Sequence, residues 1–296
     1  GGWPFVYNGA YIAKGERWGD RSRMQLAAYA LTDRGRRRSQ NQDNVLCYTL
    51  QGSKTPVGLY AVADGMGGQS AGEIASQIAI DTVREELGQF LEHTVGATPA
   101  FGDDVVTGRL VENDEPTEAP NLSLVDLLSG AMQQCNHRIR EHGLQNPDTA
   151  GLGSTLTVVM VTGDLALIGN IGDSRTYILR DGTIRSLTQD HSLVGSLVRQ
   201  GLITEDDVYK HPHRNLIYNA LGTRPDANPD IAMHRLQGGD ILLLCSDGLW
   251  EMVRDEDIRA IVEELADPTE AATSLVDAAN QNGGVDNISV VIVRVQ

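Results

Sequence analysis

The order of strand-like and helical patterns along this chain limits the folds that it can adopt. Short apolar runs typical of β-strands outnumber the amphipathic helical stretches, and those stretches come in pairs rather than after each strand. A doubly wound parallel sheet needs a helix between most consecutive strands, whereas a layered α+β fold does not. The sequence therefore predicts a layered α+β architecture.

The individual elements follow from the spacing of the apolar residues. Strands are predicted over residues 25–32, 45–50, 57–63, 154–161, 165–170, 176–179, 241–245 and 288–295. Helices are predicted over residues 70–91, 124–140, 192–200, about 214–221, 255–265 and 269–280. Over residues 70–91, for example, Ala75, Ala79 and Val83 recur every four residues, which places them on one face of a helix.

One domain with two irregular segments is predicted. Residues 1–24 are polar and glycine-rich, and we interpret them as an irregular lead-in to a single domain over residues 25–296. Residues 96–122 hold six acidic residues and one arginine among many Gly, Pro and Thr residues. This composition indicates an acidic surface loop inserted between two helices, because neither flank looks self-sufficient as a domain.

The net charge argues against nucleic acid as a partner. Lys and Arg number 24 against 40 Asp and Glu, which gives a net charge of −16 at pH 7. Such a charge repels phosphate backbones and anionic lipid surfaces unless basic residues cluster, and Arg36-Arg37-Arg38 is the one cluster present. No apolar run approaches the roughly 20 residues that span a membrane. We therefore expect neither a nucleic-acid partner nor a membrane segment.

The cysteines favour a reducing compartment. The chain has three, with no Cys-x-x-Cys spacing; Cys47 and Cys245 lie in strand-like runs and Cys135 in a helical pattern. Small buried thiols explain all three better than disulfides or a metal site. A cytoplasmic location is predicted.

Four aspartates fall at the ends of apolar strand-like runs: Asp64, Asp173, Asp247 and Asp286. Each alone is ordinarily a turn residue. If all four converge in a partly desolvated site, however, their mutual repulsion is large, and divalent cations are the usual remedy. An all-oxygen ligand set favours Mg²⁺, Mn²⁺ or Ca²⁺ over zinc.

A glycine-rich run, Gly65-Met66-Gly67-Gly68, follows the first of these aspartates and precedes a helix. It lacks the Gly-Lys-Ser/Thr ending of a P-loop. We interpret its glycines as positions that let the backbone approach a bound ion closely.

Seven short motifs then connect the chain to a known family. They are Arg38-Ser39-Gln40-Asn41-Gln42-Asp43, Val62-Ala63-Asp64-Gly65-Met66-Gly67-Gly68, Gly153-Ser154-Thr155, Asn170-Ile171-Gly172-Asp173-Ser174-Arg175, Leu187-Thr188-Gln189-Asp190-His191-Ser192, Ser246-Asp247-Gly248-Leu249 and Asp286-Asn287-Ile288-Ser289. Over about residues 25–296 the chain resembles the metal-dependent protein phosphatases of type 2C, in particular the bacterial members. The resemblance implies a four-layer αββα sandwich of two antiparallel sheets flanked by helix pairs.

The resemblance also implies the metal ligands. Asp64 would bridge two ions, with the Gly65 carbonyl on one of them, and Asp247 and Asp286 would hold the other. Asp173 would bind a third ion together with Asp247. Two or three Mn²⁺ or Mg²⁺ ions would generate a bridging hydroxide that attacks phosphoserine or phosphothreonine.

The remaining implied roles concern the phosphate and water. Arg38 matches the phosphate clamp of the family, and Asp43 would orient metal-bound water. Met66 stands where many eukaryotic members have a histidine, so the general acid stays unassigned. Gln42 stands where the family usually has a glutamate that contacts one metal through water, which puts the affinity for that metal in question.

A flap beside the active site is implied over about residues 188–225. Within it, His191 is predicted to be a packing or hydrogen-bonding residue. His211-Pro212-His213 is predicted to form a turn, because its spacing does not suit a zinc site. Phosphorylated proteins, the products of a Ser/Thr kinase, are the expected partners.

Two alternatives stay open at this stage. A catalytically inactive member that serves as a regulatory or binding module is supported by Gln42 alone. A metal-dependent nuclease is disfavoured by the acidic charge. Hydrolysis of a phosphopeptide with Mn²⁺, compared with hydrolysis of single-stranded DNA, distinguishes the phosphatase from these two alternatives.

Overall fold

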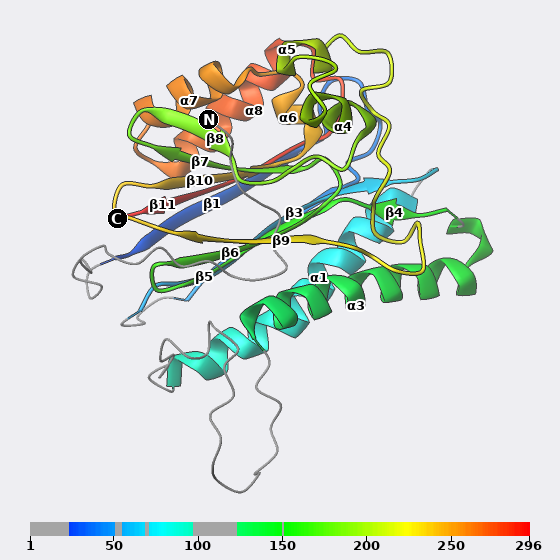
Figure 1. The fold of residues 1–296 in the computed structure, drawn as a ribbon, viewed down its shortest axis with the longest axis horizontal. Helices are drawn as coiled ribbons and strands as arrows, with labels where there is room; N and C mark the ends of the chain where they lie inside the picture. The colour runs from blue at the N-terminus through cyan, green and yellow to red at the C-terminus, as the bar shows by residue number, and fades with distance from the viewer. Residues whose placement is uncertain (1–23, 51–54, 69–70, 97–122, 150) are drawn as a thin grey trace, which may run out of the picture.

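The computed structural model describes residues 24–50, 55–68, 71–96, 123–149 and 151–296 (Figure 1). Nearly all of the predicted lead-in 1–24 and of the predicted acidic insertion 96–122 lies outside these residues. Both assignments therefore stay predictions.

The first β-sheet has five strands in the order β1-β11-β10-β7-β8. Each strand pairs antiparallel with its neighbours. The strands are β1 (Leu26–Asp33), β11 (Ile288–Val295), β10 (Ile241–Cys245), β7 (Arg175–Arg180) and β8 (Thr183–Ser186). Strand β11 thus lies between β1 and β10, so segments that are far apart in the sequence meet in this sheet.

The second sheet follows the order β2-β3-β5-β6-β9, again antiparallel. Its strands are β2 (Asp43–Thr49), β3 (Val57–Met66), β5 (Leu156–Thr162), β6 (Leu165–Ile171) and β9 (Asp230–Arg235). The two-residue strand β4 (Gly153–Ser154) pairs with the end of β3.

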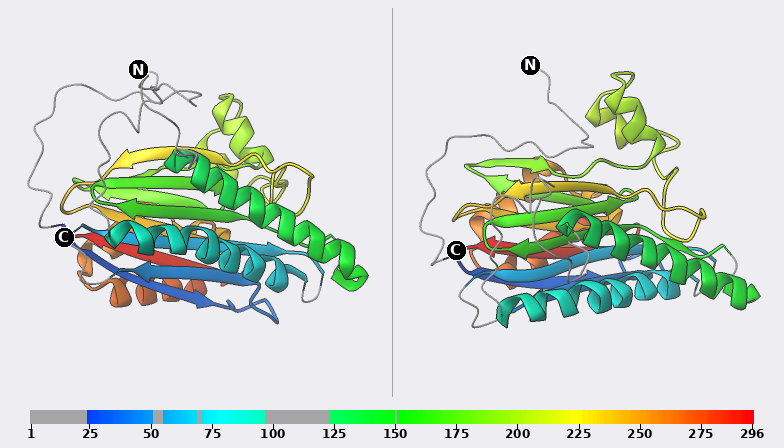
Figure 2. Two further views of the ribbon diagram at one scale, coloured as in Figure 1. Left: turned by 90° about the horizontal axis from the view of Figure 1, so that it is seen from below. Right: turned by 60° about the horizontal axis from the view of Figure 1, so that its bottom comes forward.

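Helices cover the outer faces of both sheets (Figures 1 and 2). The pair α1 (Ala71–Gly96) and α3 (Leu124–Gln145) packs on the second sheet, and α7 (Asp255–Glu264) and α8 (Pro268–Gln281) pack on the first. Three shorter helices, α4 (Leu193–Arg199), α5 (Glu205–Val208) and α6 (Asp247–Trp250), and the 3-10 turn η2 (Pro147–Thr149) complete the described elements. The predicted four-layer αββα sandwich is confirmed.

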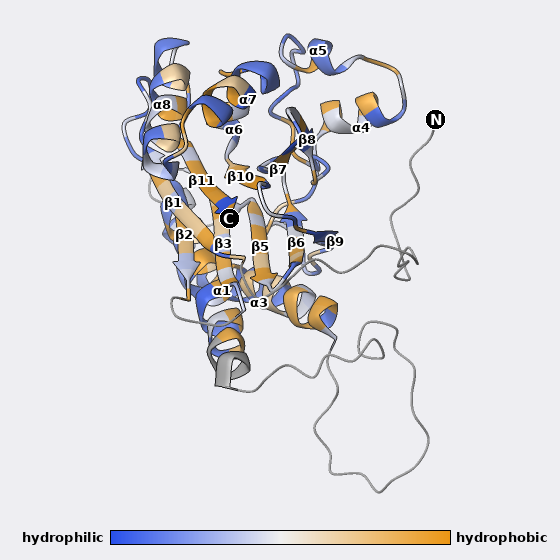
Figure 3. Cartoon of the chain, turned by 90° about the vertical axis from the view of Figure 1, so that its left-hand side faces the viewer, coloured by the Kyte–Doolittle hydropathy of each residue, from blue (hydrophilic) through white to orange (hydrophobic). Residues whose placement is uncertain are grey.

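Both faces of each central strand are buried, which explains why these strands read as continuous apolar runs. In β3, Tyr60 and Val62 face the space between the sheets, whereas Leu59 and Ala61 pack toward α1 and α3. Successive side chains of a strand point to opposite faces, so one strand contributes to two cores. Figure 3 shows the hydrophobic residues concentrated on such central strands, including β10 and β11.

The predicted helix at about residues 214–221 is wrong. The segment forms turns, with the Arg214 amide donating to the His211 carbonyl at 3.2 Å, and then extended backbone. Ile217 and Leu221 form isolated β-bridges with Ser192 and Ser154. These long-range backbone hydrogen bonds replace the local ones that a helix would make.

The burial of the cysteines differs from the prediction at one position. Cys135 and Cys245 are buried, but Cys47 is exposed, because it lies on β2, the edge strand of its sheet. All three are free thiols. None of the helices in the described ranges combines the length and the hydrophobicity that crossing a membrane requires.

Candidate functional site

The predicted site aspartates come from both sheets and share one electrostatic environment. Asp64 lies near the end of β3 and Asp173 just after β6, whereas Asp247 begins α6 after β10 and Asp286 precedes β11. Burial is the largest cause of the raised pKa of Asp64, and the charges of Asp43, Asp247, Asp173 and Asp286 raise it further. Three of the same carboxylates also raise the pKa of Asp247 beyond the effect of its burial. The folding of the two sheets therefore gathers carboxylates that are far apart in sequence.

Hydrogen bonds fix the backbone at Asp64. Its amide donates to the Thr155 hydroxyl at 3.0 Å, and its carbonyl accepts from the Thr155 amide at 2.9 Å and the Ser154 hydroxyl at 3.0 Å. The strand register places Asp43 directly opposite Asp64. The end of β3 is thus held from both sides.

The next residue, Gly65, lies where backbones approach too closely for a side chain. A Cβ added to Gly65 would lie 2.0 Å from the Gly72 carbonyl oxygen, and one added to Gly72 would lie 2.6 Å from the Gly65 carbonyl oxygen. The Gly65 amide donates to the Gln42 carbonyl at 3.1 Å. Two glycines therefore let α1 begin directly against the end of β3.

Asp43 links the two sheets. Its Oδ2 accepts hydrogen bonds from the hydroxyls of Ser246, at 2.8 Å, and Ser289, at 2.7 Å, which belong to the first sheet and its connection to α6. Burial raises the pKa of Asp43 to about 6, against the lowering effect of these hydroxyls. Its other oxygen, Oδ1, is buried with no hydrogen-bond partner among the described residues.

The pKa values of the other carboxylates are raised as well. Burial raises the pKa of Asp64 and of Asp247 well above the usual aspartate range, and neighbouring carboxylates raise it further. Burial, followed by the charge of Asp190, raises the pKa of Asp173 to about 7. Oδ1 of Asp173 and Oδ1 of Asp247 are also buried with no partner in the described ranges.

Buried carboxylate oxygens with neither a donor nor a cation are unfavourable, and oxygen atoms are the ligands that Mg²⁺ and Mn²⁺ prefer. The donor set therefore fits such ions. Within the described parts of the chain, no three His, Cys, Asp or Glu side chains already form a ready ligand group. Carboxylates shared between ions, the Gly65 carbonyl and water would have to complete the coordination, as is usual for Mg²⁺.

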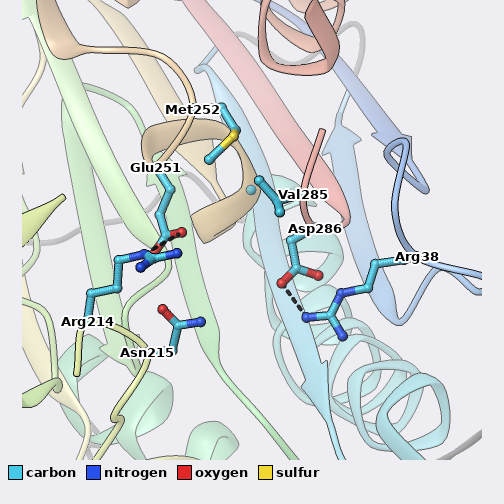
Figure 4. Close-up of a pocket in the computed structure, with 8 residues that line it drawn as sticks. Arg38, Arg214, Asn215, Glu251, Met252, Val285 and Asp286 are labelled. Carbon is cyan, nitrogen blue, oxygen red and sulfur yellow. Dashed lines mark hydrogen bonds and ion pairs between the residues drawn. The ribbon is translucent and has the colours of Figure 1, made fainter. Parts of the chain in front are cut away.

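A small pocket adjoins the carboxylates. It has a volume of about 120 Å³, and Arg38, Asp286, Arg214, Asn215 and Glu251 are among its lining residues. Figure 4 shows two ion pairs on opposite sides of it, Arg38 with Asp286 at 2.6 Å and Arg214 with Glu251 at 3.3 Å. The pocket thus presents guanidinium groups from two separate segments next to the aspartates.

The turn that carries Asp173 is supported by a buried cation–π contact. The Trp250 indole donates to the Asp173 carbonyl at 3.0 Å, and the Arg175 guanidinium lies 3.7 Å from the centre of the Trp250 ring. Arg175 also donates to both carboxylate oxygens of Asp190, at 3.0 and 2.8 Å. The roles of Arg175 and Trp250 could not be predicted from the sequence, because their contacts exist only in the folded chain.

The histidines behave as the sequence predicts. His191 is buried, and its Nε2 lies 3.0 Å from a carboxylate oxygen of Asp230. The His213 amide donates to Nδ1 of His211 at 3.2 Å within a turn. Arg214, Asn215 and Glu251 were not predicted as site residues. For Arg214 and Asn215, the available signal was their place in the flap predicted over about residues 188–225.

Comparison with known proteins gives consistent matches. A family model described as Protein phosphatase 2C matches residues 32–281. The serine/threonine protein phosphatase PstP of Mycobacterium tuberculosis is 35% identical over 272 residues, which cover 92% of this chain and 45% of PstP. The serine/threonine phosphatase stp of Listeria welshimeri is 34% identical over 263 residues, covering 89% of this chain and 93% of stp. The chain thus spans about half the length of PstP and nearly all of stp.

Solved structures agree with the observed fold. The crystal structure of the M. tuberculosis phosphatase PstP/Ppp has a TM-score of 0.73 at 34% identity and covers 91% of this chain and 98% of its own. The PstP catalytic domain in complex with two manganese ions has a TM-score of 0.72 at 32% identity, covering 92% and 99%.

Proposed function

Because the chain belongs to the protein phosphatase 2C family of metal-dependent serine/threonine phosphatases, we propose that it removes phosphate from phosphoserine and phosphothreonine in proteins. The observation that carries this proposal is the set of buried carboxylate oxygens that have no hydrogen-bond partner among the described residues, beside a pocket that presents Arg38. Phosphate hydrolysis needs positive charge at the reacting group. This arrangement provides a place for metal ions and, in Arg38, a guanidinium group.

Asp64, Asp173, Asp247, Asp286 and the Gly65 carbonyl would hold two or three Mn²⁺ or Mg²⁺ ions. A PstP catalytic domain at 32% identity contains two manganese ions, which supports this assignment. When bound, the ions supply an activated water nucleophile and offset the phosphate charge.

Asp43 orients water in the site. The hydroxyls of Ser246 and Ser289 engage its Oδ2, so its Oδ1 is the atom left to accept a hydrogen bond from a water molecule. The fixed Asp43 carboxylate would accept a hydrogen bond from a water O–H at a defined place. Asp43 would thus position the water without itself touching the substrate.

Arg38 binds the phosphate. One of its nitrogens, Nη2, donates to Asp286, and the side chain is 52% exposed, so further N–H groups are available on the pocket side. A guanidinium fork matches two oxygens of a phosphate and stabilises charge in the transition state. The guanidinium therefore lies beside Asp286, a proposed metal ligand.

Phosphorylated substrates of a Ser/Thr kinase are the proposed partners, and signal transduction in the cytoplasm is the proposed setting. The bacterial serine/threonine phosphatases among the relatives support the substrate class. The three unpaired thiols fit a reducing compartment.

Asp247→Asn provides the test, with phosphate release from a phosphothreonine peptide in Mn²⁺ as the measurement. The variant should lose at least about 10²-fold in kcat, because a neutral amide does not replace a metal-binding carboxylate. Asp240→Asn is the control: Asp240 is a buried aspartate that pairs with Arg180 and lies outside the carboxylate cluster.

Asp240→Asn should keep its activity at temperatures where it stays folded. Wild-type protein that binds Mn²⁺ but releases no phosphate would favour an inactive binding module. Cleavage of single-stranded DNA without peptide dephosphorylation would favour a nuclease.

A further inference from the structure

The loop that carries Arg38 joins β1 to β2 and rests on the connection between α8 and β11. The amides of Arg36 and Arg37 both donate to the Gly284 carbonyl, at 2.8 and 3.1 Å. Gly35 has a φ of +76°, and a Cβ there would lie 2.1 Å from the Asp286 carbonyl oxygen. The loop therefore packs backbone to backbone against the segment that holds Asp286.

One side chain spans this contact and holds both ends of the loop. Nδ2 of Asn287 donates to the carbonyls of Arg34 and Gln40, both at 2.9 Å, and its Oδ1 accepts from the Gln42 amide at 2.8 Å. Asn287 is 5% exposed. Both of its N–H donors are thus used within the protein, on carbonyls that lie before and after Arg38.

The guanidinium itself has little else to hold it. Its side chain is 52% exposed, and its hydrogen bond to Asp286 is made by a long side chain with several rotatable bonds (Figure 4). Exposed ion pairs of this kind contribute little to fixing a geometry. The placement of Arg38 therefore depends on the backbone from which it extends.

We propose that Asn287 is a positioning residue for phosphate binding: its carboxamide fixes the loop over residues 34–42 and so places the Arg38 guanidinium beside Asp286. This inference rests on the proposed role of Arg38 in binding phosphate. Asn287 touches neither the substrate nor the reacting atoms; it acts through the loop. A misplacement of about 1 Å at a reacting centre can cost up to about 10²-fold in rate, so the effect is measurable.

The chain contains a matched control. Nδ2 of Asn136 in α3 donates to the carbonyls of Arg224 and Pro225, at 3.1 and 3.0 Å, and its Oδ1 accepts from the Gly222 amide at 2.7 Å. Asn136 is 2% exposed. It therefore clamps a different loop with the same three kinds of hydrogen bond at similar burial.

The experiment is a double-mutant cycle with Arg38→Ala, Asn287→Ala and Asn136→Ala. The measurements are kcat/KM on a phosphothreonine peptide at saturating Mn²⁺, inhibition by inorganic phosphate, Mn²⁺ binding by calorimetry and the melting temperature. Asn287→Ala should lower kcat/KM by about 10-fold to 10²-fold and weaken phosphate inhibition. In the Arg38→Ala background it should have almost no further effect, whereas Asn136→Ala should act equally in both backgrounds.

Three results would overturn the inference. Equal losses from Asn287→Ala with and without Arg38, equal behaviour of the two asparagine variants, or a loss of Mn²⁺ binding in Asn287→Ala would each mean that Asn287 does not act through Arg38. Asn287→Ser, which keeps a small polar group, replaces the alanine variant if that variant does not fold. An unimpaired Arg38→Ala protein would instead disprove the proposed phosphate clamp.

Discussion

Gln42 stands where the resemblance to the type 2C phosphatases implies a glutamate. Its backbone carbonyl accepts from the Gly65 amide at 3.1 Å and from the Ser76 hydroxyl at 2.6 Å, so its position next to the aspartate cluster is fixed. Its side-chain Cδ lies 2.9 Å from where a Cβ on Gly72 would stand, at the start of α1. The side chain therefore lies close to Gly65, whose carbonyl is a proposed metal ligand.

Gln42→Glu should lower the Mn²⁺ concentration for half-maximal activity several-fold. A charge within a few ångströms of a divalent ion still contributes on the order of 1 kcal/mol after screening. The rate at saturating Mn²⁺ should change less. Gln40→Glu, which adds the same charge in the same loop at an exposed position, controls for the net charge. Superimposable titrations of wild type and Gln42→Glu would show that position 42 does not influence the metal.

The residues that we propose for the chemistry were predictable to different degrees. Asp64, Asp173, Asp247 and Asp286 could be found because each follows or precedes an apolar run directly. Asn287 was part of a recognised motif. Its three hydrogen bonds, however, go to residues far away in the sequence, and the sequence does not indicate that these residues lie near it. The same holds for Trp250, whose partner is a backbone carbonyl in another turn.

At the scale of secondary structure, strands buried on both faces were predicted well and exposed ones were missed. The prediction found β3, β10 and β11, whose apolar runs are continuous. It missed β8 and β9, which are edge strands with mostly exposed residues. These two segments are strands because each pairs with a neighbouring strand. The pattern of apolar residues does not reveal such pairing.

Helix α1 offers a test of how an element positions the site. Gly72→Ala would place a Cβ 2.6 Å from the Gly65 carbonyl oxygen, whereas a Cβ at Gly88 in the same helix meets nothing within 4 Å. Gly88→Ala should raise the free energy of unfolding by up to about 1 kcal/mol, because alanine is the better helix former. Gly72→Ala should lower it by about 1–3 kcal/mol and weaken Mn²⁺ binding.

Chemical denaturation and calorimetry on the two glycine variants provide the measurement. If Gly72→Ala were as stable and bound Mn²⁺ as well as Gly88→Ala, the close contact between α1 and the end of β3 would not shape the site.

At the scale of the whole molecule, the carboxylate cluster lies where the two sheets meet. Asp43, Asp64 and Asp173 belong to the second sheet and its turns, and Asp247 and Asp286 to the first. An ion held by residues from both sheets binds only the folded chain. At a concentration about 100 times its Kd, such an ion adds about 2.7 kcal/mol to the free energy of unfolding.

The stability of the metal-free protein should fall as the pH rises. The pKa of Asp43 is raised to about 6 and that of Asp173 to about 7, so between the unfolded pKa and these values the folded state binds more protons than the unfolded state. Their contribution is fully present below the unfolded pKa and is lost as the pH rises through 6 and 7. With EDTA, the melting temperature should therefore be lower at about pH 7.5 than at about pH 5.5.

Added Mn²⁺ should raise the melting temperature more at the higher pH, because the ion binds the ionised carboxylates. A Mn²⁺ effect that is equal at both pH values would indicate that the ion binds elsewhere.

We propose above all that ions held by this carboxylate cluster drive phosphate hydrolysis. The most direct test is phosphate release from a phosphothreonine peptide while Mn²⁺ is titrated into protein stripped with EDTA and dialysed. We expect no release without added metal, and then a saturable increase that Mg²⁺ also supports, because the proposed ligands are all oxygen atoms. Full release in the continued presence of excess EDTA would contradict it.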